Sequence, residues 1–124
     1  MIILDACVLI ALTDATNSCH AEARSIMSAA DRFAITALTG AEVMVYPMPS
    51  AVGTWADLFR DLGIEVVPIT ANDMAAIAAL RRQSGLKMPD ALVLWLASQR
   101  QACVATFDQR LAAKAGEYRL AVLP

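Results

Sequence analysis

The sequence of 124 residues has a single histidine, three cysteines and no long hydrophobic run, and each shortage excludes a class of protein. Its longest uninterrupted apolar runs, such as 91–97, are far shorter than the roughly 20 residues that a membrane span requires, so we expect no membrane association. No basic stretch precedes the apolar N-terminal residues, which argues against a secretory signal. We therefore expect a cytoplasmic protein.

The single histidine and the three cysteines restrict the catalytic mechanisms and metal sites that the chain can form. With His20 alone, the chain cannot use a mechanism that needs two imidazoles, and a zinc site is not favoured. No GxSxG elbow accompanies His20, so we interpret it as a packing or capping residue of an alanine-rich helix. The three cysteines form no CxxC pair and are odd in number, which indicates small buried side chains rather than disulfides or a zinc site. They are Cys7, Cys19 and Cys103.

Hydrophobic residues make up 58% of the chain and charged residues 18%, a composition typical of one compact domain over residues 1–124. Short apolar runs separated by helical stretches predict an α/β fold. We expect a three-layer α/β/α sandwich with a central, mostly parallel sheet of four to five strands. The expected strands are 1–4, 33–36, 64–69 (at a sheet edge, because of Pro68), 103–105 and 118–122. The expected helices are 6–12, 18–30, 38–46, 50–62, 70–82, 89–101 and 109–115.

Four of the twelve acidic residues stand in apolar surroundings. Asp5 interrupts the core-like MIILDACVLI, where a lone buried charge costs several kcal/mol unless it is compensated. Glu42 lies within TGAEVMVY, Asp90 precedes ALVLWLA and Asp108 follows a strand in CVATFDQ. Because the carboxyl ends of parallel strands meet at one crevice, we expect Asp5 and Asp108 there. The other two acids lie on helices that can lean over it.

Four converging carboxylates would repel one another and raise their own pKa values, a conflict that a divalent cation removes. Oxygen ligands without imidazole or thiolate favour Mg²⁺ or Mn²⁺, which can activate water for phosphodiester hydrolysis. Each acid also has a simpler interpretation. Asp90 suits a helix first turn, Asp108 an N-cap and Glu42 a solvent-facing helix position.

Four stretches, ILDACVLIAL, ITALTGAEVM, LKMPDALVLWLA and VATFDQRLA, resemble in order and spacing the acidic blocks of VapC-like PIN-domain ribonuclease toxins of type II toxin–antitoxin modules. The resemblance implies a PIN-like fold and a Mg²⁺- or Mn²⁺-dependent endoribonuclease, usually dimeric and inhibited by a cognate antitoxin. The implied catalytic and metal-binding residues are Asp5, Glu42, Asp90 and Asp108. We expect Asp5 and Asp90 to be the main metal ligands, Glu42 to hold the ion or orient its water, and Asp108 to support a second ion or water.

Two neighbours of these acids bear on the resemblance. Cys7 stands where the family commonly has serine or asparagine, and a thiol is a poorer hydrogen-bond partner, so support for Asp5 is expected to be weaker. Thr106 matches the family's hydroxyl residue before the last acid. Its side chain could orient Asp108 or hold a metal-bound water, and the alternative is an ordinary β-branched residue at a strand end.

A net charge of −2 is unusual for a protein that binds RNA. Without the four candidate acids, however, the chain has ten basic and eight acidic residues, so the rest of the chain is mildly basic. Four basic residues near Asp90 and Asp108 are candidates for phosphate contacts: Arg81, Arg82, Lys87 and Arg110. A solvated helix face explains Arg81 and Arg82 equally well.

Two other functions remain open from the residues alone. The first is another Mg²⁺-dependent phosphohydrolase, such as an aspartyl-phosphate phosphatase with Asp5 as nucleophile, although that chemistry needs a second acid where Cys7 stands. The second is a non-catalytic PIN-fold interaction module. The YPMP stretch and the helix after it are candidates for a dimer or antitoxin surface, which charge substitutions at Met44 and Val45 would test.

Overall fold

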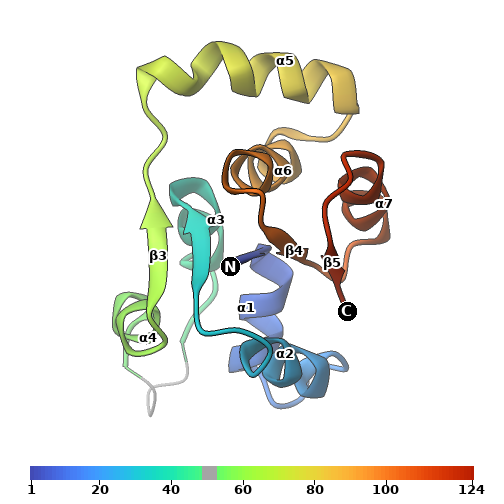
Figure 1. The fold of residues 1–124 in the computed structure, drawn as a ribbon. Helices are drawn as coiled ribbons and strands as arrows, with labels where there is room; N and C mark the ends of the chain where they lie inside the picture. Colours follow the sequence, from blue (N-terminus) through green and yellow to red (C-terminus); the bar gives the residue numbers. More distant parts are fainter. Residues whose placement is uncertain (49–52) are drawn as a thin grey trace.

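The computed structural model describes residues 1–48 and 53–124. In this part of the chain, five strands form one sheet in the order β3-β2-β1-β4-β5 (Figure 1). All four strand pairings are parallel, which confirms the predicted α/β class. The strands are β1 (Ile2–Leu4), β2 (Phe33–Thr36), β3 (Ile64–Val67), β4 (Cys103–Ala105) and β5 (Val122–Leu123).

Helices cover both faces of this sheet, and the alternation of side chains along β1 shows why. Ile2 and Leu4 pack into one hydrophobic cluster and Ile3 into the other, so every residue of the strand is buried. The first cluster lies under α1 (Ala6–Thr13), α2 (His20–Met27) and α4 (Trp55–Asp61). The second lies under α5 (Met74–Ser84), α6 (Met88–Arg100) and α7 (Gln109–Glu117). The result is the expected three-layer sandwich.

The remaining helix, α3 (Ala37–Val43), continues directly from the carboxyl end of β2. The Thr36 side chain caps it by accepting a hydrogen bond from the Thr39 amide. Val43 packs into the first cluster, whereas Leu38 packs against the second. This helix therefore stands near the carboxyl edge of the sheet, between the two layers.

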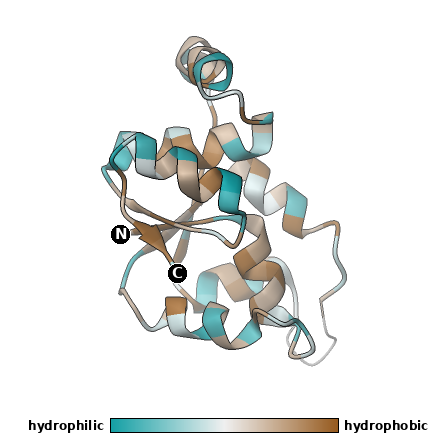
Figure 2. Ribbon diagram, turned by 90° about the vertical axis from the view of Figure 1, so that its right-hand side faces the viewer, coloured by the Kyte–Doolittle hydropathy of each residue, from teal (hydrophilic) through white to brown (hydrophobic). Residues whose placement is uncertain are grey.

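The distribution of hydrophobic residues matches the three layers of the fold. In Figure 2 the strand arrow beside the two termini is brown, and the surrounding helices carry teal residues along their sides. Helix α6 is the most deeply buried helix, because its residues 91–97 are all inaccessible to solvent or nearly so. Within the described residues, no helix combines the length and hydrophobicity that crossing a lipid bilayer requires.

Several predicted boundaries were wrong by a few residues. Helix 18–30 shrinks to α2, helix 38–46 to α3, and strand 64–69 ends at Val67. Helix 70–82 is divided into a 3-10 turn at Ala71–Asp73 and helix α5. Helix 50–62 is observed as α4, and its predicted start lies outside the described residues. The position of β3 at a sheet edge is confirmed.

The largest correction concerns the last strand, which was expected at 118–122 and is found at Val122–Leu123. Tyr118 instead completes the end of α7, where its amide donates to the Lys114 carbonyl at 3.1 Å. Arg119 then turns the chain with a φ of 60°. The predicted strand thus started four residues before the chain reaches the sheet at Val122.

His20 has the capping role that the sequence indicated. Its Nδ1 lies 2.8 Å from the carbonyl oxygen of Ala11, near the C-terminal end of α1. This contact joins α2 to the end of α1, where the Ala11 carbonyl also accepts a hydrogen bond from the Asp14 amide at 3.4 Å. The three cysteines are free thiols, as expected, and each is half-buried.

Candidate active site

Asp5 stands at the junction of β1 and α1, and the structure explains why a carboxylate is tolerated there. Its side chain is only 8% exposed. Oδ1 accepts a hydrogen bond from the Ala6 amide at 2.8 Å, which caps α1. Oδ2 accepts from Thr106 Oγ1 at 2.7 Å and from Cys7 Sγ at 3.3 Å. Three donors therefore compensate the burial of this charge.

Thr106 and Asp108 lie beside Asp5 because β4 pairs with β1. The last residues of the two strands, Leu4 and Ala105, face each other in the parallel register. The Thr106 side chain is 3% exposed, and its Oγ1 accepts from the Asp108 amide at 3.0 Å while donating to Asp5. Thr106 thus orients the Asp5 carboxylate and the backbone of Asp108.

The sequence allowed Asp108 to be either a helix N-cap or a residue of the crevice, and it is both. Its Oδ1 accepts from the amides of Arg110 at 2.9 Å and Leu111 at 3.0 Å, so the residue is the N-cap of α7. It also lies on the crevice side of β4. The sheet order reverses between β1 and β4, and this switch point is where open α/β sheets bind ligands.

Glu42 and Asp90 reach the same crevice from α3 and from the first turn of α6. Burial raises the pKa of Glu42, and the negative charges of Asp5 and Asp90 raise it further. Burial likewise raises the pKa of Asp90, together with the charges of Asp5 and Asp108, while Lys87 and Arg110 oppose the shift. Repulsion by neighbouring carboxylates therefore acts on Glu42 and on Asp90.

The four basic candidates separate into two pairs. Lys87 and Arg110 lie close enough to lower the pKa of Asp90. The Arg110 Nη2 also donates to the carbonyl of Gly85 at 3.0 Å, which ties α7 to the loop before α6. Arg81 and Arg82 are exposed in the last turn of α5, and in the described part of the chain no interaction joins them to the acids. The structure therefore favours Lys87 and Arg110 as neighbours of the site.

The donor set suits a hard divalent cation. Carboxylate oxygens dominate the crevice, and the one nearby thiol is not a thiolate: burial, and then the charge of Asp5, raises the pKa of Cys7 to about 11. Across residues 1–48 and 53–124, no three His, Cys, Asp or Glu side chains form a group ready to hold a metal directly. A small hydrated ion fits this arrangement, because Mg²⁺ keeps several waters and takes only one or two carboxylates directly.

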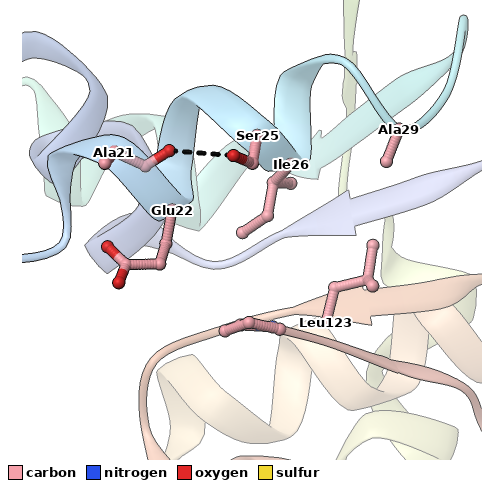
Figure 3. Close-up of a pocket in the computed structure, with 7 residues that line it drawn as sticks. Ala21, Glu22, Ser25, Ile26, Ala29 and Leu123 are labelled. Carbon is pink, nitrogen blue, oxygen red and sulfur yellow. Dashed lines mark hydrogen bonds between the residues drawn. The ribbon is translucent and has the colours of Figure 1, made fainter.

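The carboxylate crevice is distinct from the cavity drawn in Figure 3. That cavity, of about 390 Å³, lies between α2 and the C-terminal strand. Its lining is mostly apolar and contains none of the four acids: Ala21, Glu22, Ser25, Ile26, Ala29, Leu123 and Pro124. The candidate site is therefore defined by its charges rather than by an enclosed volume.

Comparisons with known proteins agree with this fold. The similar solved structures include a toxin–antitoxin complex from Klebsiella pneumoniae, with 24% identity over 88% of both chains and a TM-score of 0.67. VapC20 of Mycobacterium tuberculosis, described as a sarcin–ricin loop cleaving toxin, has 17% identity over 91% of this chain and 94% of that chain, with a TM-score of 0.70. FitAcB from Neisseria gonorrhoeae has 19% identity over 100% of this chain and 97% of that chain, with a TM-score of 0.65.

At these identities the structural neighbours establish a shared fold. No curated protein sequence matches the chain. The model of the PIN domain family matches residues 2–117, and the structural neighbours, which include VapC20, share the fold. The protein therefore belongs to the PIN domain family.

Proposed function

We propose that this protein is a Mg²⁺- or Mn²⁺-dependent endoribonuclease and the toxin of a toxin–antitoxin pair. The observation that carries the proposal is the electrostatic conflict at the β1–β4 switch point. There burial, and then the charge of Asp5, raises the pKa values of Glu42 and Asp90. Such a cluster destabilises the fold unless a cation neutralises it, and perturbed carboxyls in a crevice are typical of functional sites.

The proposed roles follow from the position of each side chain. When bound, the metal ion would lower the pKa of a water molecule and stabilise negative charge on the phosphate. Asp5 and Asp90 serve as the main ligands, and Glu42 holds the ion or orients water. Asp108 uses Oδ1 for its cap, which leaves Oδ2 to face a second ion or water. Thr106 fixes the Asp5 carboxylate through its 2.7 Å hydrogen bond.

The RNA backbone would contact the basic neighbours of the site. Lys87 and Arg110 flank Asp90 from the start of α6 and from the first turn of α7. Both are exposed, so each can pair with a phosphate while the carboxylates hold the ion. Arg81 and Arg82 remain candidates for more distant phosphate contacts.

The test of this function is cleavage of a mixed RNA pool by the purified protein. We expect cutting with Mg²⁺ or Mn²⁺, complete loss in excess chelator, and recovery when excess metal is restored, because the carboxylates alone provide no neutralising charge. Single-stranded DNA of matched sequence measures the preference for RNA.

Cutting that persists in chelator would contradict the metal requirement. No cutting and no calorimetric sign of metal binding would favour the interaction module, and a trapped acyl phosphate on Asp5 would favour the phosphatase.

We also propose that the protein forms a homodimer and binds a cognate antitoxin. The similar structure from Klebsiella pneumoniae is described as a toxin–antitoxin complex. On this chain, three consecutive residues after α3 expose apolar side chains: Met44 (53% exposed), Val45 (81%) and Tyr46 (52%). A continuous exposed apolar surface of this kind is typical of a protein interface. Pro49, the end of the predicted YPMP surface, lies outside the described residues.

Val45→Asp is expected to convert the dimer to a monomer, because a charge at the most exposed of these positions would be desolvated in the interface. Light scattering after size-exclusion chromatography measures the mass. Met74→Asp is the matched control, since Met74 is 66% exposed at the start of α5 and is not part of this surface. A dimeric Val45→Asp variant would exclude this interface. A monomeric wild type would exclude the homodimer and leave the antitoxin as the partner for the surface.

A further inference from the structure

Cys7 connects the two sides of the candidate site. It is the second residue of α1, and its Sγ donates to Asp5 Oδ2 at 3.3 Å. The same sulfur accepts a hydrogen bond from the Phe107 amide at 3.4 Å and lies 3.7 Å from Thr106 Oγ1. These contacts span about 100 residues of sequence and join the end of β1 to the turn that follows β4.

We propose that the Cys7 thiol is a positioning residue, which holds the Asp5 carboxylate and the 106–108 turn in the arrangement that metal binding requires. A thiol can donate and accept at the same time, and here it donates to a carboxylate and accepts from an amide. Phe107 lies between Thr106 and Asp108, so fixing its amide fixes the backbone that carries both. Partners that orient ligands in this way commonly change metal affinity strongly when they are removed.

This role extends the expectation drawn from the sequence, in which the thiol gives Asp5 weaker support than serine or asparagine. The structure shows that sulfur reaches both partners from position 7, although each hydrogen bond is longer than a hydroxyl would make. A serine at this position offers the same donor and acceptor with a shorter reach. An alanine offers neither. The pair of substitutions therefore separates hydrogen bonding from mere occupancy of space.

The inference rests on the proposed metal-dependent function, and Mn²⁺ binding tests it without any assay of cleavage. The signal of free Mn²⁺ in electron paramagnetic resonance gives the dissociation constant for wild type and each variant. We expect Cys7→Ala to weaken Mn²⁺ binding about 10-fold, and Cys7→Ser to stay within about 2-fold of wild type. Cys103→Ala is the matched control. Its thiol is also half-buried, but among the described residues it donates only to the adjacent Val104 carbonyl, at 3.7 Å.

The outcomes distinguish this inference from the function on which it rests. Wild type and Cys7→Ala binding Mn²⁺ equally tightly would overturn the role of Cys7 and leave the metal site intact. Cys7→Ser falling as far as Cys7→Ala would also overturn it, because hydrogen bonding would then not be the cause. A wild type that binds no Mn²⁺ would overturn both this role and the proposed function.

A second measurement does not depend on the metal or on the folding of the alanine variant. NMR measures the chemical shift of the Phe107 amide proton in wild type and in Cys7→Ser. This shift depends on the atom at position 7 that accepts the hydrogen bond from the amide. We expect it to move when oxygen replaces sulfur, because amide proton shifts respond to the strength of the hydrogen bond. An unmoved resonance would show that position 7 does not bond the Phe107 amide and would overturn the inference.

Discussion

Asp5→Asn is expected to lower metal-dependent RNA cleavage about 100-fold or more while the fold stays intact. Neutralising this carboxylate removes charge that holds the ion, and a loss of about 3 kcal/mol of transition-state stabilisation corresponds to roughly 100-fold in rate. Asparagine is as good an N-cap as aspartate, so α1 keeps its first hydrogen bond to Ala6. Single-turnover cleavage measures the rate, and circular dichroism with thermal melting measures the fold.

Two further variants make the Asp5 result specific. Asp5→Ala removes the cap as well as the charge, so it is expected to lose about 1 kcal/mol of stability in addition to activity. Asp61→Asn removes an exposed acid that pairs with Arg60 on α4, and it should cut RNA at the wild-type rate. Cleavage by Asp5→Asn at more than about one tenth of the wild-type rate would be incompatible with a metal role for Asp5.

Asp90→Asn is expected to have opposite effects on activity and on stability without metal. Cleavage falls about 100-fold or more for the same reason as at Asp5. Without metal, however, the variant should melt about 2 °C or more above wild type, a shift that about 0.5 kcal/mol produces in a chain of this size. The reason is that Asp90 is repelled by Asp5 and Asp108 and adds to the repulsion on Glu42. Removing its charge relieves both.

The pH dependence of this gain has a definite sign. The folded-state pKa values of Asp90 and Glu42 are raised, so the folded state binds more protons than the unfolded state near those values. The metal-free wild type therefore loses stability as pH rises from the ordinary carboxyl range through the raised pKa values. The advantage of Asp90→Asn should be present at neutral pH and disappear in acid, where both carboxyls are protonated in either state.

Melting curves with and without Mn²⁺ complete this test. Mn²⁺ should raise the melting temperature of wild type, because a ligand that binds only the folded state stabilises it, and the increase should be much smaller for Asp90→Asn. The Asp61→Asn control should show neither the metal-free gain nor the smaller metal response. A metal-free Asp90→Asn protein that melts below wild type would contradict electrostatic repulsion in the crevice.

The order and type of most elements could be predicted because the signals are local. Strand β1 is a continuous apolar run since both of its faces are covered, and helix α6 has Pro89 in its first turn followed by an apolar stretch. Asp5 stood out because a charge within such a run requires compensation. Boundaries were less predictable, as the end of α7 shows. Tyr118 has strand-like character, yet its amide completes a helical turn.

The sequence by itself determined the α/β class and marked the four acids as candidates for an oxygen-ligated cation, since these inferences depend on residue types and on neighbours along the chain. Only the tertiary structure decided which donors compensate Asp5 and which basic residues adjoin Asp90. It also decided that a thiol links the two strand ends. The physical reason is that β1 and β4 pair across about 100 residues, so the contacts of Thr106 and Phe107 with residues 5 and 7 exist only once the sheet has formed.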